Sequence, residues 1–402
     1  MRFLLVFYFI FLYNHVFSID DTLKYNILWN KRIDYFDSAT IVFKSDIFVN
    51  KKSVYLSYCS INNAYIKSFD TKNGDILLLS DKLNVKNTYF NVLSLKNLIL
   101  ANDFFNIYLI NKRNLKTLIK YETPIGFSIN NVGYIDNSIY SSIKSENNIS
   151  ENAWLTKSNI NRLGLWDTLV KISIDTSGYS PYLYSDFNVF KNKLIFVQNR
   201  SFNFSNLDGK IDFFCFDIKN KEIKWQVNDL DSSGNSNVNA IYVNKNNVYF
   251  LGHHTIYAFD IVSGKKLWQY SISSSPSYNF LLGYANIQFS EEKLLLKTNG
   301  DLLVCLDINS GKELWKSVNS GSNPSKMKLY KNKLIYVANN TNSTKTSIHI
   351  IDVITGEILN RIQSPNENNI LKKASFNCNQ SFVVKKNKLY ISDSYYLMCF
   401  SL

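Results

Sequence analysis

The stretch Ile256-Tyr-Ala-Phe-Asp260-Ile-Val-Ser-Gly264-Lys-Lys-Leu-Trp268 decides the fold, because Leu303-Val-Cys-Leu-Asp307-Ile-Asn-Ser-Gly311-Lys-Glu-Leu-Trp315 repeats it without a gap. Weaker copies contain Asp70 with Gly74, Asp217 with Trp225, and Asp352 with Gly356. Degenerate copies complete a series whose anchors are residues 70, 111, 161, 217, 260, 307, 352 and 401. Successive anchors are 41 to 56 residues apart, a period typical of propellers and other repeat folds.

Each unit predicts four antiparallel strands. An apolar strand ends at the Asp, whose carboxylate can accept backbone N–H groups within a turn, and Gly then takes a position that needs positive φ. Upstream lies a second hairpin, as in Phe190-Lys-Asn-Lys and Tyr330-Lys-Asn-Lys, where we expect Asn to adopt the left-handed conformation. Four strands per unit predict an all-β, eight-bladed β-propeller. Seven blades are the alternative, because the unit around Asn161 is poorly defined.

The two ends of the chain predict how the ring closes. The last unit stops at Leu402, one residue after its anchor, and therefore lacks its outermost strand. The segment Asn26-Ile-Leu-Trp29-Asn-Lys resembles Glu313-Leu-Trp315-Lys and can supply that strand. We expect pairing of the N- and C-terminal strands, which removes a free sheet edge.

Residues 1–18 have the pattern of a cleaved signal peptide. Arg2 precedes an apolar run from Phe3 to Tyr13, and Val16-Phe17-Ser18 offers a cleavage site. A retained anchor is the competing interpretation, although eleven apolar residues are short for a bilayer span of about 20. No lipid-attachment Cys follows, and no later run is long enough to cross a membrane. The sequence predicts a secreted or periplasmic protein with one propeller domain at residues 19–402.

Composition sets further bounds. Of the 402 residues 46% are hydrophobic, 15% aromatic and 19% charged, which excludes a disordered chain, a coiled coil and a collagen-like fibre. The net charge of +13 comes from Lys residues scattered among turns, which indicates a solvated surface. No basic stripe interleaved with aromatic residues appears, so nucleic acid is not an expected partner. We expect a monomeric propeller.

No residues are predicted to be catalytic or to bind a metal or cofactor. After the signal only His253, His254 and His349 remain, and adjacent strand residues such as His253 and His254 would point to opposite faces. No GxSxG, HExxH or phosphate-loop motif occurs. Cys215, Cys305 and Cys399 stand two residues before an anchor, where Ala258 occurs in another unit, which predicts buried packing positions. Pairing of Cys59 with Cys378 is left open.

The loops suggest where a ligand would bind. Asn–Lys turns and Asp–Gly turns should lie on one face, and the connections of variable length on the other. Two long loops carry aromatic residues and an arginine that could form a protein- or glycan-binding patch, although they could equally cover the rim without binding anything. These candidate binding residues are Arg200, Phe202, Phe204, Tyr278, Phe280 and Tyr284.

The pattern Ala258-Phe-Asp260-x-x-x-Gly264-Lys-x-x-Trp268 resembles the repeat of the PQQ-binding-like propeller family. In that family the recurring Trp packs between neighbouring blades, a role that the resemblance implies for Trp29, Trp225, Trp268 and Trp315. Some members are quinone-dependent dehydrogenases with two consecutive cysteines and a calcium ion, and this chain lacks such a pair. Other members are scaffolds without a cofactor.

The sequence therefore leads to a non-catalytic exported scaffold that binds a protein or cell-envelope component through its long-loop face. The alternatives are a PQQ- and calcium-dependent oxidoreductase of alcohols or sugars, and a glycan-binding propeller. No cofactor is expected except under the oxidoreductase alternative.

Overall fold

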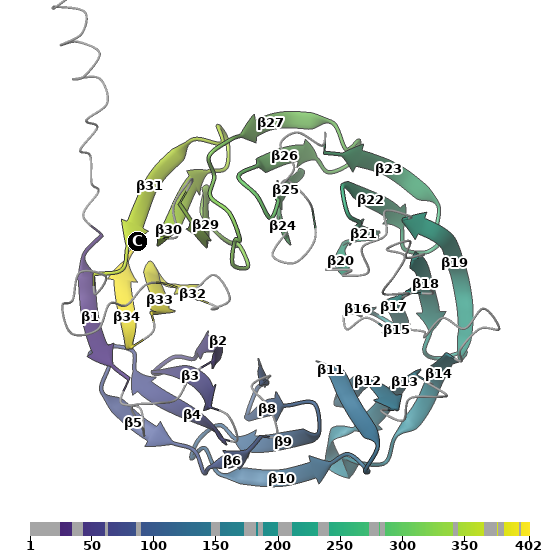
Figure 1. The fold of residues 1–402 in the computed structure, drawn as a ribbon, viewed down its shortest axis with the longest axis horizontal. Coiled ribbons are helices and arrows are strands. Elements are labelled where there is room, and N and C mark those ends of the chain that lie inside the picture. Colours follow the sequence, from purple (N-terminus) through teal and green to yellow (C-terminus); the bar gives the residue numbers. More distant parts are fainter. Residues whose placement is uncertain are drawn as a thin grey trace, which may run out of the picture.

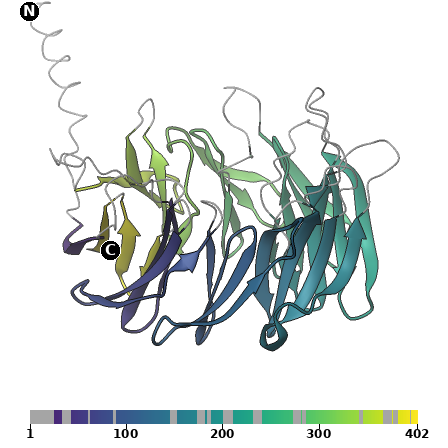
Figure 2. The same ribbon diagram turned by 60° about the horizontal axis from the view of Figure 1, so that its bottom comes forward.

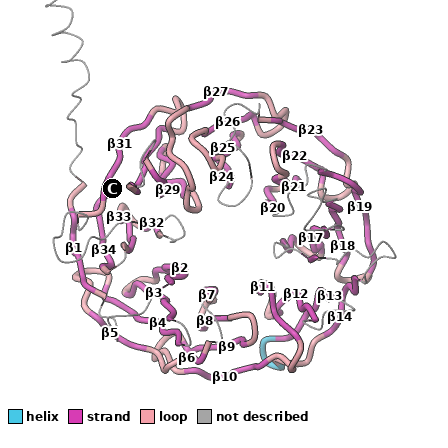
Figure 3. Tube along the Cα trace, in the orientation of Figure 1, coloured by secondary structure: helices cyan, strands magenta, loops and turns pink. Residues whose placement is uncertain are grey.

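The structure, a computed structural model, has an all-β architecture of eight antiparallel sheets arranged as the blades of a ring (Figure 1). The structure describes residues 25–33, 43–60, 63–85, 90–145, 153–172, 182–183, 188–199, 211–231, 241–272, 281, 286–340, 345–365, 376, 382–393 and 395–402. Over these ranges the one helical element is the short 3-10 helix η1 (Ile160–Arg162) in blade 3 (Figure 3). The eight-bladed propeller is confirmed and the seven-bladed alternative is excluded.

In each blade we name the strands A to D from the axis outward. Blade 1 has β2 (Phe43–Val49), β3 (Ser53–Ser60), β4 (Asn63–Asp70) and β5 (Ile76–Leu79), with β6 (Leu83–Asn84) beside β4. Blade 2 has β7 (Asn91–Ser94), β8 (Leu98–Asn102), β9 (Asn106–Asn111) and β10 (Thr117–Glu122). Blade 3 has β11 (Phe127–Ile135), β12 (Ser138–Ser145), β13 (Ala153–Asn159) and β14 (Asp167–Ile172). Blade 4 has β15 (Tyr182–Leu183) and β16 (Asn188–Phe190) beside β17 (Lys193–Asn199), followed by β18 (Ile211–Asp217) and β19 (Glu222–Asp231).

The second half is more regular. Blade 5 has β20 (Ile241–Asn244), β21 (Asn247–Leu251), β22 (Thr255–Asp260) and β23 (Lys266–Ser271). Blade 6 has β24 (Asn286–Ser290), β25 (Lys293–Lys297), β26 (Leu303–Asp307) and β27 (Glu313–Ser317). Blade 7 has β28 (Lys328–Tyr330), β29 (Lys333–Asn339), β30 (Thr346–Asp352) and β31 (Ile358–Gln363). Blade 8 has β32 (Val383–Lys385), β33 (Lys388–Ser392), β34 (Tyr396–Ser401) and, as its outermost strand, β1 (Ile27–Arg32).

Pairing of β1 with β34 closes the ring, as the sequence predicted. The register places Trp29 opposite Cys399 and Arg32 opposite Tyr396. The N-terminal strand therefore completes the blade that the C-terminus leaves one strand short, and blade 8 has no uncovered β34 edge.

One hydrogen bond recurs in all eight blades and holds two turns together on one face. The residue that follows the last position of strand C donates its N–H to a carbonyl of the A–B turn, over 2.8–3.1 Å. The donor–acceptor pairs are Thr71–Lys52, Lys112–Asn97, Ile160–Asn137, Ile218–Asn192, Ile261–Asn246, Ile308–Glu292, Val353–Asn332 and Leu402–Asn387. We call this face the short-turn face and the opposite one the long-loop face (Figure 2).

This hydrogen bond corrects one anchor position. In blade 3 the bond comes from Ile160, so the residue equivalent to the Asp anchors is Asn159 and not Asn161. The Asn159 side chain accepts the N–H of Asn161 over 2.8 Å, in the way an anchor Asp accepts backbone N–H groups. The helix η1 follows the anchor and lengthens this turn, which hid the true position in the sequence.

The A–B turns also correct a conformational expectation. Lys191, Lys245 and Lys331 have φ of 55°, 54° and 52°, whereas the Asn that follows each of them does not have positive φ. In these blades Lys therefore takes the left-handed position that the sequence analysis assigned to Asn. Asn387 in blade 8, together with Lys386, and Asn137 in blade 3, together with Asp136, do have positive φ.

The Asp anchors hold the C–D turns. Asp260 Oδ1 accepts the N–H groups of Val262 and Ser263 over 3.1 and 2.7 Å, and the same pattern recurs at Asp217, Asp307 and Asp352. The hydroxyl and N–H of Ser263 are the main reasons why the pKa of Asp260 lies below its usual value. The carboxylate is thus kept ionised as a turn cap.

Trp side chains connect successive blades at four interfaces. Trp268 donates Nε1–H to the carbonyl of Ile308 over 3.0 Å, and Trp29, Trp225 and Trp315 make the equivalent bond over 3.1–3.3 Å. Each indole covers the glycine of the next blade: a Cβ on Gly311 would lie 2.6 Å from Trp268. This contact and the φ of 71° both require glycine there.

At the interface between blades 1 and 2, two leucines take the places that Trp and Gly have at the four interfaces above. Blade 1 has Leu78 where other blades have Trp, opposite Ser68, and blade 2 has the buried Leu115 where others have Gly. Leu78 packs against the cluster that contains Leu115, which keeps a positive φ of 57° despite its side chain. A smaller residue on one blade is therefore balanced by a larger one on the next.

The residue opposite each Trp on strand C is small. Cys215, Cys305 and Cys399 face Trp225, Trp315 and Trp29 across the strand pair. All three thiols are buried, and burial raises their pKa to about 11. Cys59 is also buried, and Cys378 lies outside the described residues.

Candidate functional site on the long-loop face

The six binding residues that the sequence suggested, Arg200, Phe202, Phe204, Tyr278, Phe280 and Tyr284, lie outside the described residues. What the structure does describe on the long-loop face are mainly the short B–C turns and two of the D-to-A connections between blades. The site is therefore built from these segments.

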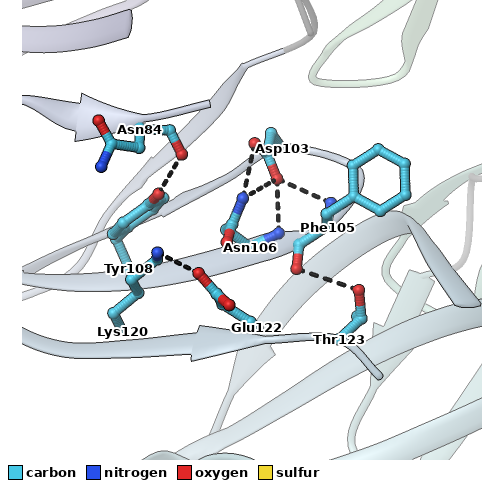
Figure 4. A network of polar contacts seen from close by, with 8 residues as sticks. All are labelled: Asn84, Asp103, Phe105, Asn106, Tyr108, Lys120, Glu122 and Thr123. Atoms are coloured by element: carbon cyan, nitrogen blue, oxygen red, sulfur yellow. Dashed lines mark hydrogen bonds and ion pairs between the residues drawn. The ribbon is translucent and has the colours of Figure 1, made fainter. Parts of the chain in front are cut away.

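The B–C turn of blade 2 is held by a buried carboxylate (Figure 4). Asp103 Oδ1 accepts the N–H of Phe105 over 2.7 Å and the N–H of Asn106. Asn106 Nδ2 donates to both carboxylate oxygens over 3.1 and 2.9 Å. These bonds fix the backbone of the turn, and they leave Phe104 and Phe105 partly buried at its tip.

Blades 5 and 8 have a side chain with a ring at the position that Phe105 occupies in blade 2. The carbonyl of Phe105 accepts the N–H of Thr123, the first residue after strand D, over 2.8 Å. The carbonyls of His254 and Tyr395 accept equivalent bonds from Ile272 and Ile33 over 2.8 and 2.7 Å. The turn of blade 8 has the same carboxylate cap, because Asp393 Oδ1 accepts the N–H groups of Tyr395 and Tyr396. We call Phe105, His254 and Tyr395 the rim rings.

The connection from blade 2 to blade 3 adds an aliphatic residue beside Phe105. Phe127 donates its N–H to the carbonyl of Pro124, and Gly126 has φ of 87°, as the third residue of a type II turn requires. Ile125 is at the apex of this turn and is fully exposed. Thr123 Oγ1 lies 3.1 Å from the carbonyl of Phe105 (Figure 4) and 3.2 Å from that of Phe127, so its one proton can be shared between them and ties the connection to the B–C turn.

An aromatic pair extends the patch onto blade 3. Phe127 is the first residue of β11 and Trp154 the second residue of β13, both at the long-loop end, with ring centroids 5.7 Å apart and planes at 55°. The N–H of Ile129 donates to the carbonyl of Phe104, which keeps the first strand of blade 3 beside the turn of blade 2. We define the apolar corner as Phe104, Phe105, Ile125, Phe127 and Trp154.

The layer beneath the corner is polar and well anchored. Tyr108 donates its hydroxyl to the carbonyl of Asn84 over 2.5 Å, and Lys120 forms an ion pair with Glu122 (Figure 4). Burial, reinforced by the negative charges of Asp103 and Glu122, raises the pKa of Tyr108. Tyr108 is therefore a neutral hydrogen-bond donor at physiological pH, and the corner rests on strands with fixed positions.

The histidines contribute no metal site in the part of the chain that is described. His253 and His254 lie in a bend rather than a strand, and their rings stack with centroids 4.0 Å apart, so the expectation that they point to opposite faces was wrong. Among the described residues no three His, Cys, Asp or Glu side chains come together as metal ligands.

The sequence analysis missed the apolar corner because it looked for long, variable loops. The usable signal was Asp followed by aromatic residues directly after strand B, as in Asp103-Phe-Phe105 and Asp393-Ser-Tyr395. An exposed apolar patch on a rigid base is typical of a surface that binds a macromolecule. In the described residues no helix has the length and apolarity to cross a bilayer.

Comparison with known proteins supports the fold and the repeat. Residues 188–359 match a PQQ-type family model described as outer membrane protein assembly factor BamB. No curated protein sequence matched the chain.

Three solved structures have the same overall fold. BamB from Moraxella catarrhalis is 10% identical with a TM-score of 0.55, over 93% of this chain and 98% of that one. The quinohemoprotein alcohol dehydrogenase ADHIIG from Pseudomonas putida HK5 is 8% identical with a TM-score of 0.61, over 94% and 76%. The computationally designed protein Ika8 is 13% identical with a TM-score of 0.62, over 94% and 99%. The chain therefore shares its fold with these structures, and residues 188–359 match the repeat of the PQQ-type family model.

Proposed function

We propose that this protein is an exported, non-catalytic scaffold that binds a protein partner through the long-loop face. Removal of residues 1–18 as a signal peptide would deliver residues 19–402 to the periplasm or the exterior. The family model that matches residues 188–359 carries the name of an outer membrane protein assembly factor, which supports an assembly or binding role in the envelope.

The single observation that carries the proposal is the apolar corner. Ile125 is fully exposed at the apex of a turn, next to the partly buried Phe104 and Phe105. Burial of such apolar side chains against a partner lowers the free energy of the complex. Aromatic residues are enriched at interfaces for this reason. Asp103 accepts the N–H of Phe105 and Thr123 donates to the Phe105 carbonyl, so the backbone of the turn is already fixed. Binding would therefore cost little conformational entropy of the backbone.

Site-specific photo-cross-linking in the source cell tests the proposal. A photoreactive residue replaces Ile125 on the long-loop face or, as the matched control, Val262, which is 62% exposed on the short-turn face. We expect a discrete protein adduct from position 125 and none from position 262. Phe104→Ser together with Phe105→Ser should remove the adduct, and a cooperative thermal transition of this variant checks that the propeller is still folded. Equal adducts at both positions, or none at 125, would contradict binding through this corner.

The absence of a cofactor is part of the same proposal and has its own test. Purified protein is incubated with pyrroloquinoline quinone and calcium, passed through gel filtration and measured for quinone absorbance. We expect no retained chromophore. Retention at a stoichiometric level would instead favour the oxidoreductase alternative.

A further inference from the structure

The propeller gathers lysines that are far apart in the sequence into one ring. The A–B turns, each with one flanking residue on either side, contain twelve Lys and three acidic residues, Asp136, Glu291 and Glu292. Strand A is the innermost strand, so these turns surround the axis on the short-turn face (Figure 1). Seven of the eight blades contribute, the exception being blade 3. We call these twelve lysines the lysine ring: Lys51, Lys52, Lys96, Lys191, Lys193, Lys245, Lys293, Lys331, Lys333, Lys385, Lys386 and Lys388.

None of the described ion pairs includes a lysine of the ring, although Lys193, Lys293 and Lys333 lie opposite the anchor residues Asp217, Asp307 and Asp352 in the strand register. The described ion pairs are Lys31–Asp75, Lys120–Glu122 and Lys224–Glu222, and all three lie outside the ring. Ring members instead contact neutral groups: Lys385 Nζ donates to the carbonyl of Val49 over 2.9 Å, and Lys191 and Lys331 lie over the rings of Phe190 and Tyr330. Besides the hydrogen bonds of their turns, the charge of Lys193 contributes to the lowered pKa of Asp217 and Asp260, so part of the ring's charge is offset by the protein. Twelve lysines against three acidic residues nevertheless leave the A–B turns with a surplus of positive charge.

Like charges also influence one another here. Lys112, in the C–D turn of blade 2, has its pKa lowered by burial and additionally by the charge of Lys385 in blade 8. Lysines separated by more than 270 residues in sequence thus come close enough to interact, because the ring closes between them. An external anion would relieve this repulsion.

Backbone conformation adds an independent observation. Lys191, Lys245, Lys331 and Lys386 all have φ between 48° and 55°, a conformation that favours Gly or Asn. The same four side chains are exposed at the turn tips. Glu291 in blade 6 and Asp136 in blade 3 have φ of 51° and 47° at the same position, so the turn itself does not select Lys. Its use in four blades places a long cationic side chain at each of those turn tips.

The arrangement fits a flat anionic surface better than a linear polyanion. The A–B turns between strands are two or three residues long, and the recurring hydrogen bond fixes each of them to the C–D turn of its own blade. The charge is spread around a circle and not along a stripe or groove. We infer that the lysine ring binds the phosphate-bearing headgroups of an anionic membrane surface. The long-loop face then points away from the membrane, so this inference is independent of the proposed protein partner.

Vesicle binding of the full chain tests the inference. Partition is measured by flotation with vesicles of phosphatidylcholine alone and with about 30 mol% phosphatidylglycerol, at about 0.05 and 0.5 M NaCl. The ring variant is K191Q/K245Q/K331Q/K386Q. The control variant K120Q/K171Q/K316Q/K326Q removes the same charge from exposed positions on the D strands and one D-to-A connection.

We expect wild type and control to bind the anionic vesicles at low salt, and the ring variant to bind at least about tenfold more weakly. Binding should be absent with phosphatidylcholine alone and should fall at high salt. Equal losses in the ring and control variants would overturn the inference, because net charge alone would then explain binding. It would also be overturned if a DNA duplex or inorganic polyphosphate bound through the ring while anionic vesicles did not.

Discussion

Replacement of His349 should remove a large part of the acid sensitivity of this propeller. His349 lies in β30 with its side chain fully buried, between Tyr336 of β29 and Arg361 of β31 in the strand register. Its ring stacks on Tyr336 with centroids 5.4 Å apart. Burial, followed by the positive charges of Arg361 and Lys297, lowers the pKa of His349 to about 3.

The sign and size of the effect follow from this lowered pKa. The unfolded chain protonates His349 near pH 6.5, whereas the folded protein keeps the imidazole neutral down to about pH 3. Between these values the unfolded state binds more protons, so acidification destabilises the fold. One pH unit corresponds to about 1.4 kcal/mol, which gives a loss of about 2 kcal/mol between pH 7 and pH 5.

Urea unfolding at pH 7 and pH 5 measures this contribution. His349→Phe keeps an aromatic ring against Tyr336 and removes the titrating group, so its free energy of unfolding should fall by about 2 kcal/mol less than that of the wild type over this range. Tyr336→Phe is the control: it loses the hydroxyl bond to the Ser320 carbonyl at 2.7 Å and should be less stable at both pH values with an unchanged pH dependence. If His349→Phe and wild type lost the same free energy, the assigned burial and charge effects would be wrong.

Three further outcomes test the packing between blades. Gly311→Ala should lower the free energy of unfolding by about 2–4 kcal/mol in a denaturant titration, because the new Cβ would meet Trp268 at 2.6 Å on a residue with positive φ, and Trp268→Leu in the same chain should restore part of the loss. Leu115→Gly should destabilise by about 1–3 kcal/mol in thermal unfolding, since the void left beside Leu78 outweighs the relief of its backbone strain, and an increase in stability would argue against this pairing. Cys305, with its pKa raised to about 11 by burial, should react with a disulfide reagent at pH 8 only after denaturant is added, as followed by thiol absorbance.

Much of the fold was predictable because the repeat is written in residues with local functions. Asp260 caps its own turn, Gly264 supplies positive φ, and alternation places apolar residues on the blade faces, so each unit specifies a sheet without reference to the others. Blade 3 was harder to align because Asn159 replaces the Asp and a 3-10 helix follows it. The Lys at positive φ in the A–B turns ran against residue preference, and no local pattern signals such an exception.

The candidate site was less predictable. Sequence reasoning directed attention to long loops with aromatic residues, whereas Phe105 and Ile125 lie in short segments with few distinguishing features. Their proximity depends on hydrogen bonds from Thr123 to the carbonyls of Phe105 and Phe127, which form only when blades 2 and 3 stand next to each other.

The amino-acid sequence alone determined that strands form in four-stranded units and which strand closes the ring, and it favoured eight blades over seven, because these features depend on spacing, turn chemistry and periodicity within about 50 residues. Only the tertiary structure decided what the surface presents. Rotation about the axis brings the same turn of every blade to one face, so lysines such as Lys191 and Lys386 become members of one ring although 195 residues separate them. Charge adds up over distance in space and not over distance along the chain, which is why a surplus that looks dispersed in the sequence becomes concentrated on one side of the molecule.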